Sequence, residues 1–250
     1  MKKINDYQKE LYEMFDLQGS REQLQKYEQW LGRFKGRKNI RILDIGGAGG
    51  CFALLLKQYF GANGVEIYVI DSVEYDSWKR EDMRDEICFI CDSVENLERH
   101  FREDTFDIIF ANRVFHHFVD ATWRKSLNGM EMIMRSVRKI LKADGAFFIL
   151  DHFFNGAAID WAPSFLIYTL TSIRSPLLVK FVHKLGSESA GVGVCFQSEE
   201  MWKKRVVRCG FSIEHVHRDP LFKLSLIKKI CLLCKNARYD CVIYAVPRKA

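Results

Sequence analysis

The 250-residue sequence has no run of 18 apolar residues, no internal repeat and no dense block of basic residues. Without a long apolar run, no transmembrane helix is expected. The first residues, MKKINDYQKELYEMF, also lack the apolar core of a secretory signal. Because eight cysteines occur without such a signal, we expect reduced thiols and a cytoplasmic protein.

The overall composition is that of an ordinary folded protein, with 48% apolar and 28% charged residues. The net charge of +6 is modest, so a mixed solvated surface is favoured over nucleic-acid binding. The length allows one large domain or two small ones. We expect a single domain over 1–250, with a helical segment (1–37), a cofactor-binding core (38–151), a cap or lid (152–197), and a final helix with an edge hairpin (198–250).

Short β-branched runs alternate with helical patterns along the chain, which favours an α/β fold with a doubly wound, Rossmann-like parallel sheet. Strands are predicted at 40–45, 65–70, 87–90, 106–111, 146–150, 211–216 and 239–246. Helices are predicted within 2–34 and at 51–60, 121–142 and 199–208, with Ser198 as an N-cap and Ala143-Asp144-Gly145 as a C-terminal stop. The last two strands lack a crossover helix, so one of them is expected to run antiparallel.

A glycine-rich loop follows the first predicted strand, in the sequence LDIGGAGG (43–50). Glycines allow the sharp turn and let a ligand approach the main chain, and the helix that follows presents unpaired N–H groups. The loop matches the G-x-G-x-x-G dinucleotide fingerprint poorly, so a nicotinamide cofactor is disfavoured. A ligand-binding loop is favoured over a simple turn.

Acidic residues close the second and third predicted strands. Asp71 follows the second, where a carboxylate can accept both hydroxyls of a ribose. Asp92-Ser93 follows the third and could accept an adenine amine or cap the segment at 94–101, and both alternatives stay open.

The segments LDIGGAGG, VIDS, FICDSVENL and DIIFANRVFHHF together resemble the class I S-adenosylmethionine-dependent methyltransferases. The resemblance is good over about 38–152 and loose over 198–247. Ala48 stands where the commonest family pattern has a glycine, and it is small enough for binding to survive. The resemblance implies a seven-stranded sheet with a reversed last strand.

The same resemblance implies the contacts of S-adenosylmethionine and of its product S-adenosylhomocysteine. The loop and the strand ends would supply them: Asp44, Gly46, Gly47, Ala48 and Gly49 along the methionine part, Asp71 and Ser72 at the ribose, Asp92 and Ser93 at the adenine, and Asn112 and Arg113 at the methionine end. The cofactor carries no phosphate and has a positive sulfonium, so acidic groups are expected near it.

Histidines at predicted strand ends are candidates for a general base. His117 is preferred over its neighbour His116, although either could instead pack on the cofactor or cap a helix. His152 follows the fifth strand and is an alternative base, with a structural role beside Asp151 slightly favoured. His183 and Tyr168 in the predicted lid could contact substrate, but a surface or core role is favoured for each.

Two Cys-x-x-Cys pairs occur, at Cys88/Cys91 and Cys231/Cys234. They lack the glycine-bearing turn of a zinc knuckle, so buried small side chains are favoured and no metal is expected. The apolar, lysine-bearing segments 161–185 and 221–235 are interpreted as covers of the sheet, in preference to a membrane contact.

We therefore expect an S-adenosylmethionine-dependent methyltransferase that methylates oxygen or nitrogen of a small, partly apolar molecule held under the cap at 152–197. Trp161, Phe165 and Leu170 in that segment favour an apolar acceptor. The alternative is a cofactor-binding scaffold without catalysis.

Overall fold

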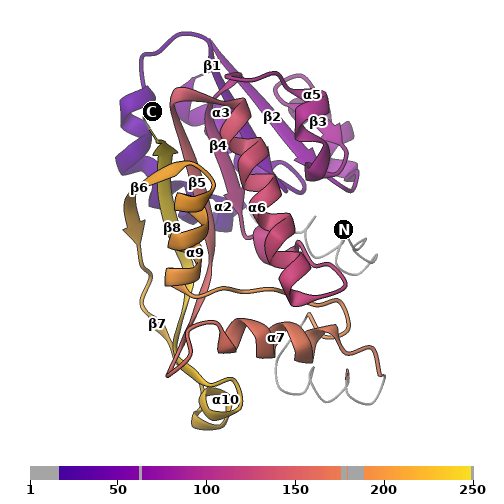
Figure 1. The fold of residues 1–250 in the computed structure, drawn as a ribbon. Coiled ribbons are helices and arrows are strands. Elements are labelled where there is room, and N and C mark those ends of the chain that lie inside the picture. Colours follow the sequence, from indigo (N-terminus) through magenta and orange to yellow (C-terminus); the bar gives the residue numbers. More distant parts are fainter. Residues whose placement is uncertain (1–16, 62–63, 176–178, 180–188, 249–250) are drawn as a thin grey trace. The chain divides into compact units, whose positions relative to one another are not determined.

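The computed structural model describes residues 17–61, 64–175, 179 and 189–248 (Figure 1). The chain forms two compact units. We call residues 17–112 with 136–148 the glycine-loop unit, and residues 113–135 with 149–248 the histidine unit. Each unit is described by itself.

The glycine-loop unit is built on parallel strands in the order β3-β2-β1-β4-β5. These are β1 (Ile40–Ile45), β2 (Val65–Asp71), β3 (Cys88–Cys91), β4 (Phe106–Asn112) and the first half of β5 (Leu141–Gly156). Strand β1 pairs in parallel with β2 on one side and with β4 on the other. The strand order therefore reverses beside β1, and ligands of open α/β sheets bind at the carboxyl ends of strands at such a point.

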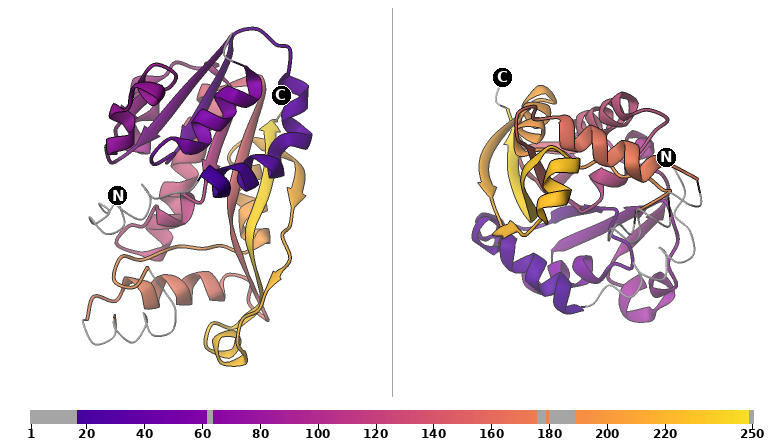
Figure 2. Two further views of the ribbon diagram at one scale, coloured as in Figure 1. Left: turned by 180° about the vertical axis from the view of Figure 1, so that it is seen from behind. Right: turned by 90° about the horizontal axis from the view of Figure 1, so that it is seen from below.

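Helices precede and connect these strands (Figure 2). Those before β1 are α2 (Leu17–Leu31) and η1 (Gly32–Phe34), and those between the strands are α3 (Cys51–Phe60), η2 (Asp76–Lys79), α4 (Glu81–Arg84), η3 (Val94–Asn96) and α5 (Leu97–His100). Aromatic rings join α2 and α3 to the sheet. Phe110 lies 5.0 Å from Tyr27, 5.1 Å from Phe52 and 5.1 Å from Phe148, between ring centroids. This cluster fixes α2 onto the sheet.

The histidine unit contains the second half of β5 and the strands β6 (Phe211–His217), β7 (Leu221–Phe222) and β8 (Cys234–Pro247), with β8 between β5 and β6. Both β6 and β7 pair antiparallel with β8. The predicted reversal of the last strand is confirmed. The helices here are η4 (Phe115–His117), α7 (Ala162–Ser172), α9 (Glu199–Arg208) and α10 (Leu226–Cys231), while α6 (Trp123–Ile140) runs through both units.

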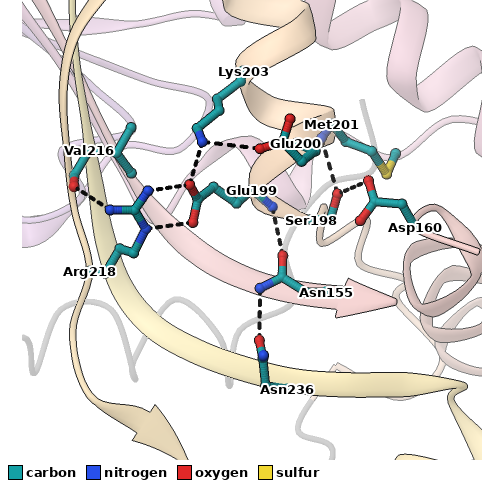
Figure 3. Close-up of polar contacts among 10 residues, drawn as sticks. All are labelled: Asn155, Asp160, Ser198, Glu199, Glu200, Met201, Lys203, Val216, Arg218 and Asn236. Atoms are coloured by element: carbon teal, nitrogen blue, oxygen red, sulfur yellow. Dashed lines mark hydrogen bonds and ion pairs between the residues drawn. The ribbon is translucent and has the colours of Figure 1, made fainter. Parts of the chain in front are cut away.

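A polar network holds the start of α9 (Figure 3). The Ser198 hydroxyl accepts a hydrogen bond from the Met201 amide, which confirms the predicted N-cap, and donates to Asp160. Glu199 forms a two-point ion pair with Arg218 of the segment after β6, at 2.7 and 2.5 Å. Carboxylate and hydroxyl oxygens at a helix N-terminus satisfy its free N–H groups and oppose its dipole.

The junction of α6 and β5 differs from the sequence prediction. The helix ends at Ile140 and the strand begins at Leu141, so Ala143-Asp144-Gly145 lies inside β5 and is not a cap. None of these three residues has the left-handed backbone of a helix stop. Strand β5 also extends to Gly156, into the predicted cap.

Part of the predicted cap lies outside the described residues, including His183. Its described portion contains α7, and Tyr168 of that helix donates a hydrogen bond to the Asp120 carbonyl, at 2.9 Å. Among the residues that the structure describes, no helix is both long enough and apolar enough to cross a membrane.

Candidate functional site

The glycine-rich loop makes a tight turn between β1 and α3. Gly46, Ala48 and Gly50 all have left-handed backbone conformations, with φ of +67°, +45° and +83°. The Gly46 amide donates to the Ile70 carbonyl of β2 at 2.8 Å, and the Gly50 amide donates to the Gly47 carbonyl at 2.9 Å. Alanine at position 48 therefore adopts the conformation that glycine adopts most readily, as expected where the family pattern has glycine.

Asp44 lies buried beneath this loop and is 1% exposed. A Cβ on Gly47 would lie 2.6 Å from Asp44 Oδ2 and 3.0 Å from Val69 Cγ1, so only glycine fits there. Asp44 Oδ1 is buried and has no hydrogen-bond partner. Burial, and secondarily the charge of Asp71, raise the pKa of Asp44 to about 8.

Asp71, at the end of β2, holds the loop from the other side. Its Oδ2 accepts a hydrogen bond from the Ala48 amide, and its Oδ1 accepts one from the Val73 amide, each at 3.2 Å. Burial raises the pKa of Asp71, and these backbone hydrogen bonds oppose that shift. The negative charge of Asp71 thus adds to burial in disfavouring ionisation of Asp44, which is mostly protonated at neutral pH.

The segment η2 supports the loop in a way that sequence reasoning missed. The Trp78 indole N–H donates to the Ala48 carbonyl at 2.8 Å, and the Ser77 hydroxyl donates to the Gly49 carbonyl at 3.0 Å. The Trp78 ring stacks on Phe89 at 4.7 Å between centroids. A tryptophan seven residues after Asp71 was the one signal in the sequence for this support.

Asp92 and Ser93 occupy the turn after β3. The Ser93 hydroxyl caps η3 by accepting from the Glu95 amide at 3.3 Å, so the capping alternative is confirmed for Ser93. Asp92 accepts hydrogen bonds from the Ser93 amide and from Asn96, and it pairs with His100 at 2.6 Å. The bond to His100 is the largest cause that lowers the pKa of Asp92 to about 2. A contact with adenine stays a prediction.

Asn112 ends β4 next to the end of β1. Its Oδ1 accepts a hydrogen bond from the Tyr27 hydroxyl, while its Nδ2 is buried without a partner. Ile45 of β1 is in register with Ala111 of β4. An unpaired buried acceptor, Asp44 Oδ1, and an unpaired buried donor, Asn112 Nδ2, therefore lie at the carboxyl ends of adjacent strands.

The histidine unit contains a second polar cluster. His116 Nδ1 lies 2.7 Å from Asp151 Oδ1, and both side chains are buried. The same oxygen accepts from the His152 amide at 2.7 Å, whereas Asp151 Oδ2 is buried without a partner. His117 completes the cluster, with its ring centroid 4.1 Å from that of His116.

His152 is oriented by Asp240, in the middle of β8. Its Nδ1 accepts a hydrogen bond from the Asp240 amide at 3.2 Å, which places its proton on Nε2. The Asp240 carboxylate forms a two-point ion pair with Arg113, at 2.6 and 2.5 Å. The Arg113 side chain is therefore engaged within the histidine unit, and its predicted backbone contact with the cofactor stays a prediction.

Burial keeps these imidazoles neutral. It lowers the pKa of His116 and His117 to about 3 each and that of His152 to about 4, and it raises the pKa of Asp151 to about 6. At neutral pH the cluster holds neutral histidines around one carboxylate, and a neutral imidazole can accept a proton.

The Cys-x-x-Cys pairs correct one expectation. Cys88, Cys91 and Cys231 are exposed, and only Cys234 is buried. The four thiols are therefore not a set of buried apolar side chains. Within the described part of the chain, no group of three or more histidine, cysteine or acidic side chains is placed to hold a metal ion.

Comparison with known proteins places these features in a family. A methyltransferase domain family matches residues 19–216, most of the chain. The uncharacterized methyltransferase YcgJ of Bacillus subtilis is 32% identical over 122 residues, which are 47% of this chain and 42% of YcgJ. The match thus spans less than half the length of this curated relative.

Solved structures share the fold at low sequence identity. The 1,6-didemethyltoxoflavin N1-methyltransferase of Burkholderia thailandensis, in complex with its substrate and S-adenosylhomocysteine, has a TM-score of 0.56 and 16% identity, covering 94% of this chain and 80% of that one. The [4+2]-cyclase SpnF has a TM-score of 0.58 and 12% identity, covering 92% and 81%. These likenesses show the fold alone. The match over residues 19–216, together with the glycine loop and the acids that follow it, shows that the chain belongs to the family of class I S-adenosylmethionine-dependent methyltransferases.

Proposed function

We propose that this protein transfers the methyl group of S-adenosylmethionine to an oxygen or nitrogen of a small, partly apolar molecule. The observation that carries the proposal is the buried, unpaired Oδ1 of Asp44 beneath the glycine loop, with the Asp71 carboxylate nearby. Next to the Asp71 carboxylate, a cationic ligand is favoured because it lets Asp44 lose its proton and carry a compensated negative charge, and the cofactor carries an ammonium and a sulfonium. The sulfonium also makes its methyl group open to attack by a nucleophile.

The residues of the glycine-loop unit fit this cofactor. Asp44, Gly46, Gly47, Ala48 and Gly49 would face its methionine part, and Asp71 with Ser72 would bind the ribose hydroxyls. Asn112 Nδ2, a buried donor without a partner, suits the methionine carboxylate. As the family resemblance implies, Asp92 and Ser93 would contact the adenine, and the backbone of Arg113 would approach the methionine end.

His116 is the favoured general base. Its Nδ1–H donates to Asp151, which leaves Nε2 free of a proton and able to accept one from the acceptor's O–H or N–H. The Asp151 carboxylate would then stabilise the imidazolium that forms. This bond favours His116 over the sequence-based choice, His117, and over His152, whose Nδ1 accepts from a backbone amide.

The expected acceptor follows from the surroundings of the histidines. The Phe196 ring lies 4.5 Å from that of His116, and the Tyr239 ring lies 4.6 Å from that of His152, between centroids. Flat apolar surfaces beside a base suit a small molecule with an aromatic or otherwise apolar body. The B. thailandensis enzyme, which shares the fold, methylates N1 of a small molecule.

The proposal is tested by incubating the protein with S-adenosylmethionine and a panel of small phenols, amines and heterocycles. We expect S-adenosylhomocysteine to form in step with a methylated product. For that acceptor, His116→Asn lowers kcat by about 10²–10⁴-fold, whereas His117→Asn, the matched control, has a much smaller effect. Bound cofactor without turnover on any acceptor favours the scaffold alternative, and undiminished turnover by His116→Asn removes the assigned base.

A further inference from the structure

A hairpin at one end of the histidine unit exposes apolar side chains. It comprises β7, α10 and the start of β8 (Figure 1). We call the hairpin tip the set of its large exposed apolar residues, which are 43–72% exposed: Leu221, Phe222, Leu226, Ile227, Ile230 and Leu233. Helix α10 has the sequence LIKKIC and buries none of its residues. Exposed apolar groups in one cluster are typical of a binding surface.

Other residues already anchor this hairpin to the protein. Leu224, Leu232 and Tyr239 pack against a buried cluster that includes Phe154 and Ile167. The Ser225 side chain caps α10 by accepting from the Lys228 amide. Within the hairpin tip, Phe222 also stacks on Tyr239 at 4.2 Å between ring centroids. Helix α10 buries none of its residues, so the inward contacts of the hairpin do not depend on Leu226, Ile227 and Ile230.

The hairpin is also strongly basic. Residues 220–239 contain no acidic residue, whereas Lys223, Lys228, Lys229, Lys235 and Arg238 all lie there. None of the four lysines forms an ion pair with a residue that the structure describes. Apolar side chains with unpaired lysines between them match an anionic lipid surface. The apolar side chains enter the acyl boundary of such a surface, and the lysines bind its phosphates.

A segment next to the hairpin also exposes apolar side chains. The Ala157 amide donates to the Leu233 carbonyl at 2.9 Å, which brings the residues after β5 beside the hairpin. In that segment Ile159 is 48% exposed and Trp161 is 47% exposed. Tryptophan is enriched where proteins meet the headgroup region of a membrane.

We propose that the hairpin tip docks this protein onto an anionic lipid bilayer. The apolar side chains enter the headgroup and acyl boundary, and the lysines contact lipid phosphates. A helix of six residues is about 9 Å long, which suits shallow insertion in the interface and not a crossing of the membrane. A second copy of the chain is a poorer occupant, because two hairpins would bring like charges together.

The test is co-sedimentation of the full chain with vesicles of phosphatidylcholine alone or mixed with phosphatidylserine. We expect binding to the mixed vesicles, weak binding to phosphatidylcholine, and a loss of binding with added salt. The triple variant Leu226→Ser/Ile227→Ser/Ile230→Ser should lose at least about tenfold in affinity. Lys228→Gln/Lys229→Gln should lose up to about fivefold per lysine.

Met132→Ser is the matched control, because Met132 is 67% exposed on α6, away from the hairpin in the sequence. It should bind vesicles like the native chain. Thermal unfolding identifies any variant that fails to fold. If the triple variant fails to fold, the binding of Lys228→Gln/Lys229→Gln decides the test. No binding of the native chain to mixed vesicles, unchanged binding of the triple and lysine variants, or a dimer that the triple variant dissociates in place of vesicle binding would each overturn the proposal. None of these readouts depends on methyl transfer.

Discussion

Gly47 and Asp44 are in contact so close that a methyl group on Gly47 would lie 2.6 Å from Asp44 Oδ2. The glycine is therefore needed because a buried carboxylate lies directly beneath the loop. The loop and its acid form one unit, and a change in either should alter cofactor binding.

Gly47→Ala is expected to weaken S-adenosylhomocysteine binding by at least tenfold, because the new methyl group must displace Asp44 or Val69 from a packed position. It should also lower the free energy of unfolding by about 1–3 kcal/mol. Calorimetric titration and denaturant unfolding measure the two effects.

Gly129→Ala is the matched control for that change. Gly129 lies in α6, and an added Cβ would meet nothing within 4 Å. Alanine should leave binding unchanged and stabilise the helix by about 0.5–1 kcal/mol. Equal affinities for native protein and Gly47→Ala would show that the close contact does not shape the site.

Binding of S-adenosylmethionine should release a proton at pH 7. With a pKa of about 8, Asp44 is mostly protonated in the free protein, and a cationic ligand lowers that pKa. Release of up to about 0.9 proton is expected. Calorimetry in buffers of different ionisation enthalpy measures it, and Asp44→Asn should abolish it. The same heat in all buffers would contradict the raised pKa.

The same carboxyl makes the free protein less stable as pH rises. The pKa of Asp44 is about 8 in the folded state, above its value in the unfolded chain. Ionisation of Asp44 therefore costs the folded state nothing below about pH 4 and lowers the free energy of unfolding progressively as the pH rises to about 8. The Tm of Asp44→Asn, compared with the Tm of the native protein, should therefore increase as the pH rises from 5 to 8. A difference that does not change with pH would count against this account.

Ala48→Gly should stabilise the protein. Alanine at φ +45° costs about 1–2 kcal/mol, and glycine removes that cost while adding about 0.4–1 kcal/mol of entropy to the unfolded chain. The mid-range values of these two effects leave a net gain of about 0.8 kcal/mol, measured by denaturant unfolding. Asn39→Gly, at φ +57°, is the control and should gain less, because asparagine tolerates this conformation. Destabilisation by Ala48→Gly would mean that the alanine methyl makes contacts that outweigh its strain.

Ser198→Ala should cost about 1 kcal/mol, because the N-terminus of α9 loses the hydroxyl that accepts from the Met201 amide and donates to Asp160. Chemical denaturation measures the loss. Ser225→Ala removes the equivalent cap from the short, exposed α10 and should cost less. If the two losses were equal, the network of Figure 3 would add nothing to the cap.

Local sequence patterns were enough for most of the fold. Strand β1 and helix α3 have the predicted bounds because a β-branched run and an apolar helical stretch meet at glycines. The predicted end of α6 was wrong because Ala-Asp-Gly commonly ends a helix. Only the pairing of strands in the sheet shows that these three residues belong to β5. The support of the loop by Trp78, and the pairing of His116 with Asp151 35 residues away, depend on contacts that no local pattern encodes.

The most direct test of the central claim is a calorimetric titration of the native protein with S-adenosylhomocysteine, with NADH as the comparison ligand. We expect micromolar binding of S-adenosylhomocysteine and none of NADH. Asp71→Ala should weaken binding about ten- to a hundredfold, as loss of a charged hydrogen bond to the ribose would. No binding of S-adenosylhomocysteine to the native protein, or equal binding by Asp71→Ala, would contradict the account.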